Sequence, residues 1–234
     1  MLFRLVADKI GDIAEAVVTI PANFSNEARD ATMQAGKSAQ LNIRYIINEP
    51  TAAALYYAFQ KGGELSGNYI VFDLGGGTFD VSVVSIRGNE VDVIASNGIQ
   101  QLGGDDFDNA IWKIVEEKYL KETGKTLDKE DFQINDAEEA KISLSKRKRV
   151  ACAVEREIID VSRLEFEEAI SSYIAQIEMV CETTIDEAGL TVTDINDVFL
   201  AGGSTRMPCI VNCIEKIFGR EPVSTVNVDE VVAL

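Results

Sequence analysis

The sequence predicts an α/β protein in which a mixed β-sheet is flanked by helices and a small α+β subdomain is inserted. Short apolar runs typical of buried strands alternate along the chain with longer segments of helical periodicity. Two pairs of successive strands are joined by tight turns, which makes them antiparallel, whereas helices separate the others. At about 150 residues per domain, 234 residues allow one large domain or two lobes.

The first part of the chain predicts a strand followed by two helices. Residues 17–20 are a short apolar run that ends at Pro21, which is typical of a strand. Ser25 then opens a helix with Glu27 in its first turn. A second, alanine-rich helix is expected at about residues 51–59.

The next part predicts the centre of the sheet. Gly62-Gly63 and Ser66-Gly67 indicate a flexible break, which is the best candidate for a domain boundary. A buried strand follows at residues 69–72. Residues 81–86 and 91–96 predict two strands joined by a hairpin turn at Gly88-Asn89.

The middle of the chain predicts the inserted subdomain. Helices are expected at about residues 106–122 and 136–145. Alternating apolar residues then predict a smaller hairpin, with strands at residues 150–154 and 158–161.

The last part returns to the sheet. A capping box at residues 162–165 opens one long helix, whose apolar stripe includes Ile170 and which Gly189 ends. A buried strand at residues 198–201 and a helix at residues 208–218 complete the predicted elements.

The composition excludes several classes of chemistry. The chain has 22 Lys and Arg, 39 Asp and Glu, and no His, which gives a net charge of −17. Without His, a Ser-His-Asp or Cys-His nucleophile and a zinc site built on imidazole are excluded. The acidic balance argues against nucleic acid or anionic membranes as partners. Carboxylates, hydroxyls, Lys, Arg and backbone amides are left to carry any chemistry.

The sequence predicts neither export nor membrane insertion. Charged residues interrupt the apolar residues at the start of the chain, unlike a signal peptide, and no apolar run approaches about 18 residues. The four cysteines include no Cys-x-x-Cys pair, so we expect free thiols that are buried or half-buried. These features favour a cytoplasmic location or an organelle matrix.

The most informative segment runs from Tyr69 to Asp80. A buried strand ends at Asp73, the three glycines 75–77 turn the chain, and a second strand leads away after Thr78. Glycine has no Cβ, so a phosphate can approach the backbone N–H groups closely, and Thr78 adds a hydroxyl donor. Asp73 and Asp80 flank the turn and could hold a hydrated Mg²⁺. The alternative is a glycine-rich hairpin whose two aspartates only cap the turn.

A second glycine turn, at residues 201–208, follows a strand and opens a helix. Ligands of such sheets bind at the carboxyl ends of strands, near helix N-termini. Arg206 in this turn can stack on an aromatic base through its planar guanidinium. A purely structural turn fits this segment equally well.

A third candidate is rejected. Gly36-Lys37-Ser38 is similar to the end of a Walker A loop, but Ala31 stands where that loop requires glycine. The triplet also lies within a helical pattern, so we expect it to be part of a helix.

Six sequence blocks resemble the nucleotide-binding domain of the 70-kDa heat-shock chaperones. They follow the order of that family, with near-family spacing, across nearly the whole chain: AVVTIPANF (16–24), IINEPTAAAL (46–55), VFDLGGGTFD (71–80), LGGDDFD (102–108), FLAGGSTRMP (199–208) and VNVDEVVAL (226–234). The resemblance implies the actin-like ATPase fold, which is ribonuclease H-like, with two lobes around a nucleotide cleft.

The resemblance also implies a division of the chain and a function. The first lobe would be represented by residues 1–66 and the start of its return by 227–234. The core of the second lobe would comprise 67–103 and 173–226, with its upper subdomain at 104–172. The implied function is ATP binding and hydrolysis coupled to client binding and protein folding. ATP or ADP, Mg²⁺ and K⁺ would be the cofactors, and client peptides, a J-domain co-chaperone and a nucleotide exchange factor the partners of the full-length protein.

By position, the resemblance assigns catalytic roles to four residues. Asp73 looks like the aspartate that binds Mg²⁺ through water, and Glu49 like the catalytic-site glutamate, which also reaches the metal through water. Thr78 would contact the γ-phosphate, and Asp80 would help to order the attacking water and cations. The implied mechanism is in-line attack of water on the γ-phosphate, which agrees with the absence of His.

The resemblance assigns nucleotide binding to a larger set of residues. Those at the phosphates and ribose would be Gly75, Gly76, Gly77, Gly103 and Gly104. Those at the adenosine would be Glu138, Lys141, Ser145, the adenine-stacking pair Ile142 and Arg206, the wall residues Gly202, Gly203 and Ser204, and Asp229. Pro21 and Arg29 match the relay thought to couple nucleotide state to substrate affinity.

The resemblance has gaps that keep other functions open. It does not extend to the family's first phosphate loop, its phosphate-polarising lysine or its peptide-binding domain. We therefore expect weak or absent hydrolysis from this chain alone, even where adenosine binding survives. The alternatives are an actin-like metabolite kinase, which would need a further substrate-binding aspartate, and a hydrolysis-deficient module for nucleotide sensing or partner docking.

Overall fold

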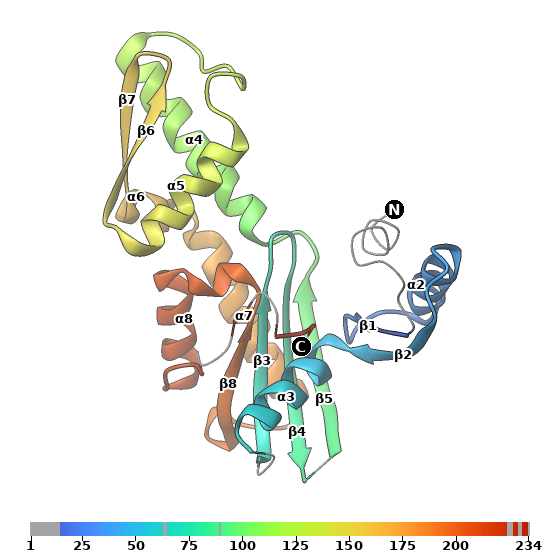
Figure 1. The fold of residues 1–234 in the computed structure, drawn as a ribbon. Coiled ribbons are helices and arrows are strands. Elements are labelled where there is room, and N and C mark those ends of the chain that lie inside the picture. Colours follow the sequence, from blue (N-terminus) through green and yellow to red (C-terminus); the bar gives the residue numbers. More distant parts are fainter. Residues whose placement is uncertain (1–14, 63–64, 89, 224–226, 229–230, 234) are drawn as a thin grey trace.

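The computed structural model describes the chain except for residues 1–14, 63–64, 89, 224–226, 229–230 and 234 (Figure 1). Its largest sheet has four strands in the order β5-β4-β3-β8. Their bounds are β3 (Ser66–Leu74), β4 (Phe79–Arg87), β5 (Glu90–Ile99) and β8 (Ile195–Ala201). β3, β4 and β5 pair antiparallel in succession, whereas β3 and β8 are parallel. The predicted mixed sheet is confirmed.

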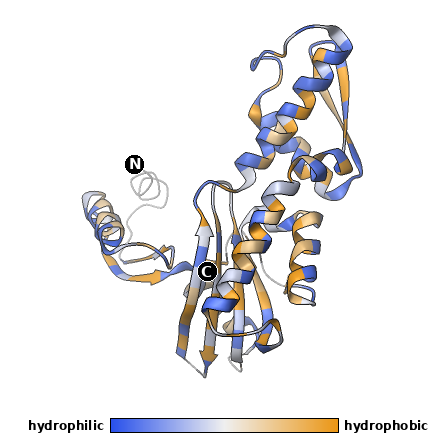
Figure 2. Ribbon diagram, turned by 180° about the vertical axis from the view of Figure 1, so that it is seen from behind, coloured by the Kyte–Doolittle hydropathy of each residue, from blue (hydrophilic) through white to orange (hydrophobic). Residues whose placement is uncertain are grey.

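Helices cover both faces of this sheet because successive residues of a strand point to opposite sides. Tyr69 and Val71 of β3 pack with α3 (Glu49–Gln60), where the Tyr57 ring stacks on Phe199 with centroids 4.2 Å apart. Ile70 and Phe72 belong instead to the larger core on the other face. That core includes α7 (Ser171–Glu187) and α8 (Pro208–Phe218). Figure 2 shows apolar residues along the strands and along these helices.

The inserted subdomain extends from one end of the sheet, as expected for an inserted α+β unit (Figure 1). It consists of α4 (Gly104–Thr123), α5 (Ile134–Lys146), β6 (Arg149–Val154), β7 (Glu157–Ser162) and α6 (Arg163–Ala169). β6 and β7 form an antiparallel hairpin. The buried face of α4 joins this hairpin to the core of the sheet. The subdomain is therefore held to the sheet by a continuous apolar core.

The N-terminal elements form a separate small sheet beside the main one (Figure 1). β1 (Ala16–Ile20) and β2 (Ile43–Asn48) are parallel and are joined by α2 (Asn26–Ser38). The Ser25 hydroxyl caps α2 by accepting from the Ala28 N–H at 3.3 Å. Gly36-Lys37-Ser38 lies within α2, as predicted. Two 3₁₀ segments, η1 (Val192–Asp194) and η2 (Gly203–Arg206), flank β8.

Two sequence predictions about local structure are wrong. Ser66 and Gly67 do not form a break, because both belong to β3 and pair with β4. The long helix predicted from the capping box is two helices, α6 and α7, separated at Ile170. At that residue the backbone leaves helical geometry (φ −97°, ψ 4°), and the Ser171 hydroxyl donates to the Glu168 carbonyl at 2.8 Å. A serine that bonds a nearby carbonyl competes with the helical ladder, while the break lets Ile170 be fully buried.

The cysteine prediction is confirmed: Cys152, Cys181 and Cys213 are buried free thiols, and Cys209 is half-buried. Among the described helices, none combines the length and the hydropathy required to cross a bilayer.

Candidate functional site

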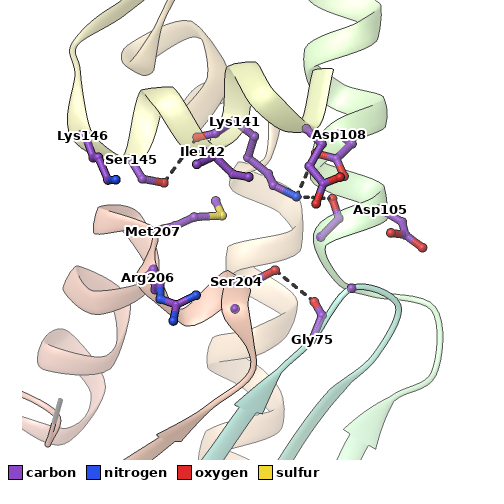
Figure 3. A pocket seen from close by; sticks show the side chains of 14 residues that line it. Gly75, Asp105, Asp108, Lys141, Ile142, Ser145, Lys146, Ser204, Arg206 and Met207 are labelled. Carbon is purple, nitrogen blue, oxygen red and sulfur yellow. Dashed lines mark hydrogen bonds and ion pairs between the residues drawn. The ribbon is translucent and has the colours of Figure 1, made fainter. Parts of the chain in front are cut away.

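A cavity of about 510 Å³ lies where the main sheet meets the inserted subdomain (Figure 3). Four parts of the chain enclose it: the first glycine turn, α4, α5 and the second glycine turn. Its lining residues are Gly75, Gly76, Gly104, Asp105, Asp108, Glu138, Lys141, Ile142, Ser145, Lys146, Gly203, Ser204, Arg206 and Met207. The name main pocket is used for this cavity below.

The first glycine turn joins β3 to β4 and is anchored to the start of α4. The Gly75 N–H donates to the Thr78 carbonyl at 3.1 Å, which closes the turn. The Gly104 and Asp105 N–H groups donate to the carbonyls of Gly75 and Gly76 at 3.0 and 2.7 Å. Backbone therefore packs directly on backbone, while Gly76 and Gly77 stay exposed on the turn, with the Asp105 carboxylate beside them.

Gly103, the residue that caps α4, makes this contact possible. A Cβ at Gly103 would lie 2.4 Å from the Gly76 carbonyl oxygen and 2.8 Å from the Gly77 nitrogen. Both distances are far below van der Waals contact, so any side chain at Gly103 would displace the first glycine turn. The glycine pair before α4 is thus required by the close approach of two backbones.

The second glycine turn holds the other side of the main pocket. Gly202 has φ +81°, and a Cβ there would lie 2.3 Å from the Leu74 carbonyl oxygen and 2.8 Å from Asp73 Oδ1. The Ser204 hydroxyl donates to the Gly75 carbonyl at 3.0 Å, which ties the two turns together. The sheet register explains this, because β3 and β8 are parallel neighbours and end at the same edge.

One face of α5 forms the wall opposite the second turn. Glu138, Lys141, Ile142 and Ser145 are spaced by three and four residues, which places them on the same side of a helix. Ile142 is 52% exposed and lies on the α5 side of the main pocket, while Arg206 lies on the η2 side (Figure 3). An apolar side chain and a planar guanidinium thus flank the same space.

Four lining residues were missed by the sequence analysis: Asp105, Asp108, Lys146 and Met207. Asp108 is the most informative of them, because it is buried and forms an ion pair with Lys141, with Oδ1 2.8 Å from Nζ. The helical spacing of residues in the sequence could have indicated Asp108. Asp108 follows Gly104 by four residues, so both project from α4 toward the same wall.

The carboxylates predicted to be catalytic gather at a second, much smaller cavity of about 10 Å³, room for a single water. Glu49 at the start of α3, Asp73 at the end of β3 and Asp80 in β4 line it, together with Pro21. Burial, followed by repulsion from Asp73 and Asp80, raises the pKa of Glu49 to about 7. Burial and the Asp80 charge raise the pKa of Asp73 to about 6, and burial also raises the pKa of Asp80.

Three like charges crowded in this way favour either a proton or a cation. Within the described residues, no three carboxylate or thiolate groups converge closely enough to bind a metal ion directly. Mg²⁺ commonly keeps several waters and binds through one or two carboxylates, which such a cluster could supply. The chemistry of the donor set fits a hydrated Mg²⁺.

The remaining predicted residues are placed as follows. Thr78 and Gly77 are exposed on the first glycine turn but line neither cavity, and Gly202 lies behind the main pocket against Asp73. Arg29 donates to Asn48 Oδ1 at 3.0 Å, one residue before Glu49. Asp229 lies outside the described residues.

Two comparisons with known proteins relate this chain to a protein family. The family profile described as "Hsp70 protein" matches residues 3–234. The sequence is also 39% identical over 250 residues to the chaperone protein DnaK of Stenotrophomonas maltophilia (strain R551-3), an alignment covering 99% of this chain and 39% of the relative. The chain thus spans about two-fifths of the length of that curated relative.

Proposed function

This chain belongs to the Hsp70 family, and we propose that it forms the ATP-binding domain of a chaperone of that family. The whole protein would be an ATPase that couples ATP binding and hydrolysis to the folding of client polypeptides. The observation that carries the proposal is the main pocket, which joins both glycine turns to one face of α5. Its size suits a ligand as large as a nucleotide.

The two ends of the main pocket offer different chemistry. The exposed backbone of the first glycine turn at Gly76 and Gly77 suits the negative oxygens of a phosphate chain. At the other end, Ile142 and Arg206 suit a flat, polarisable base, because a guanidinium stacks on aromatic faces and an aliphatic side chain packs on them. Glu138, Lys141 and Ser145 between these ends supply polar groups for a sugar. We propose an adenine nucleotide as the ligand.

The carboxylate cluster supplies the proposed metal site. Glu49, Asp73 and Asp80 would hold a hydrated Mg²⁺, which neutralises phosphate charge when bound. Because the pKa values of these three carboxyl groups are raised, a nearby cation would stabilise their ionised form. Asp80 and Glu49 would orient a water for in-line attack on the γ-phosphate, and Thr78 would contact that phosphate through its hydroxyl.

We propose the division into lobes that the family implies, with α3 packing on the sheet of the neighbouring lobe. The actin-like fold would account for the mixed sheet, with residues 67–103 and 173–226 as the core of one lobe and 104–172 as its upper subdomain. Residues 1–66 and 227–234 would belong to the other lobe. Pro21 contacts the cavity of Glu49, and Arg29 bonds Asn48, so both are placed to report on the metal site. Clients, a J-domain co-chaperone and an exchange factor are proposed as partners of the whole protein.

Calorimetric titration of the chain with ADP and with ATP, each with Mg²⁺, tests the proposal. We expect saturable binding of both, and no binding at high micromolar nucleotide would overturn it. Single-turnover release of phosphate measures hydrolysis separately from binding. ATP-dependent phosphorylation of a sugar or another small metabolite would instead favour a kinase, an activity to which the family match gives no support.

A further inference from the structure

The buried ion pair between Asp108 of α4 and Lys141 of α5 lies in the wall of the main pocket (Figure 3). The side chains of Lys141 and Asp108 are only 8% and 7% exposed. Burying two charges costs desolvation that their attraction rarely repays, and apolar residues of similar size often serve stability as well. The burial of this ion pair in the wall of a pocket therefore indicates a functional role.

The geometry shows what the pair does to Lys141. An ammonium carries three N–H donors. One donates to the Gly104 carbonyl at 3.2 Å, and the ion pair with Asp108 fixes a second direction at 2.8 Å. Among the described residues, Nζ makes no hydrogen bond beyond the one to Gly104, so donors remain for a ligand in the main pocket. The position of Nζ is thus set from two sides before any ligand arrives.

Asp108 lines the main pocket, but its side chain is only 7% exposed. Its Oδ1 is fully buried and, although close to Nζ, accepts no hydrogen bond of good geometry from the described residues. Burial raises the pKa of Asp108, and the hydrogen-bonding and charge of Lys141 oppose this rise. The carboxylate therefore depends on Lys141 for its charged form, and Lys141 depends on the carboxylate for its position.

We propose that Asp108 is a positioning residue, which directs the Lys141 ammonium toward the sugar hydroxyls of the bound nucleotide. This inference rests on the proposed function. The site would then select nucleotides whose ribose carries free hydroxyl groups. Glu138 and Asp105 line the same region and add negative charge, so a phosphate on the 2′ or 3′ position would be rejected. Because Asp108 acts only through Lys141, its effect on binding should disappear when Lys141 is replaced, whereas an effect of packing would remain.

A double-mutant cycle with two ligands tests this. The variants are Asp108→Asn, Lys141→Met and the double variant, and the matched control is Glu122→Gln, which removes an exposed charge from the same helix. Affinities for ADP and for 2′,3′-dideoxy-ADP, each with Mg²⁺, are measured by calorimetry at a temperature where all variants are folded.

We expect Asp108→Asn to weaken ADP binding about 5- to 10-fold and dideoxy-ADP binding less than about 2-fold, with less than about 2-fold further loss when Lys141 is already Met. Glu122→Gln should leave both affinities within about 2-fold. Equal losses for the two ligands, an undiminished loss in the Lys141→Met background, or no loss at all would each overturn the proposal. Absence of ADP binding to the unmodified chain would instead refute the proposed function itself.

Should Asp108→Asn not fold, Asp108→Glu tests the same claim, because it keeps the charge but moves the carboxylate by one methylene. It is expected to weaken ADP binding at least about 3-fold while sparing dideoxy-ADP. Equal weakening of the two ligands, or none, would contradict a positioning role.

Discussion

Gly103→Ala is expected to disable the phosphate end of the main pocket without unfolding the protein. The added Cβ would lie 2.4 Å from the Gly76 carbonyl oxygen and 2.6 Å from its carbonyl carbon. Ordinary contacts of this kind are roughly 1 Å longer, so the first glycine turn must move by about that amount. The backbone at Gly103 is extended (φ −176°), which alanine adopts without strain, so the whole effect comes from the overlap.

The magnitude follows from what the movement disturbs. Forcing a methyl group into a packed contact costs about 1–3 kcal/mol. The Asp105 N–H to Gly76 carbonyl bond, at 2.7 Å, would lengthen as well, at a cost of about 1 kcal/mol. We expect the free energy of unfolding to fall by about 2–4 kcal/mol. A 1 Å displacement of groups that grip a ligand can cost about 100-fold, so ADP affinity should fall by about 10- to 100-fold.

Denaturant unfolding and calorimetric titration with ADP and Mg²⁺ measure the two effects on the same preparation. The matched control is Gly124→Ala at the opposite end of α4, where φ is +70° and no atom lies within 4 Å of the added Cβ. This control should lose about 1 kcal/mol of stability and no nucleotide affinity. ADP affinity within about 2-fold of the unmodified chain in Gly103→Ala would refute the idea that this turn grips the phosphates.

Three further outcomes follow from the geometry. Arg206→Ala should weaken ADP binding more than Asp73→Ala does, because Arg206 lines the base end of the main pocket whereas Asp73 lies at the metal cavity; calorimetry showing the reverse order would contradict this placement. Glu49 and Asp73 have folded-state pKa values of about 7 and about 6, above their unfolded values, so their own contribution to metal-free stability should be fully present below about pH 4 and should fall by about 1–2 kcal/mol as the pH rises to about 8. Glu49→Gln should flatten that profile in pH-dependent thermal melts, and an unchanged slope would count against the cluster. Tyr57→Phe should cost about 1–2 kcal/mol in urea unfolding, because the buried hydroxyl donates to the Leu200 carbonyl at 3.0 Å and accepts from the Leu200 N–H at 3.2 Å; a loss below about 0.5 kcal/mol would show that these bonds contribute little.

Strands, caps and turns were predictable because their causes are local. The Ser25 cap, the stop at Gly189 and the helix that begins at Pro208 all follow from the chemistry of a few adjacent residues. The break at Ile170 was not predictable in this way. An apolar stripe continues across it, and the burial of Ile170 in the core, together with the Ser171 hydroxyl bond, accounts for the division into two helices.

The chain's own residues determined most of the elements, with β2 and the break between α6 and α7 as exceptions, and they determined the mixed sheet and the two glycine turns. A run of glycines between two strands indicates a turn that another backbone or a ligand can approach closely. The residues of the chain also indicated which face of α5 carries polar groups, through the spacing of Glu138 and Lys141. Only the tertiary structure decided that β3 and β8 are parallel neighbours, which brings both turns to one edge of the sheet. The spacing from Gly104 could have placed Asp108 on the pocket side of α4, but only the tertiary structure showed its burial and its ion pair with Lys141. Contacts between residues far apart in sequence depend on how the elements pack, and no local pattern encodes them.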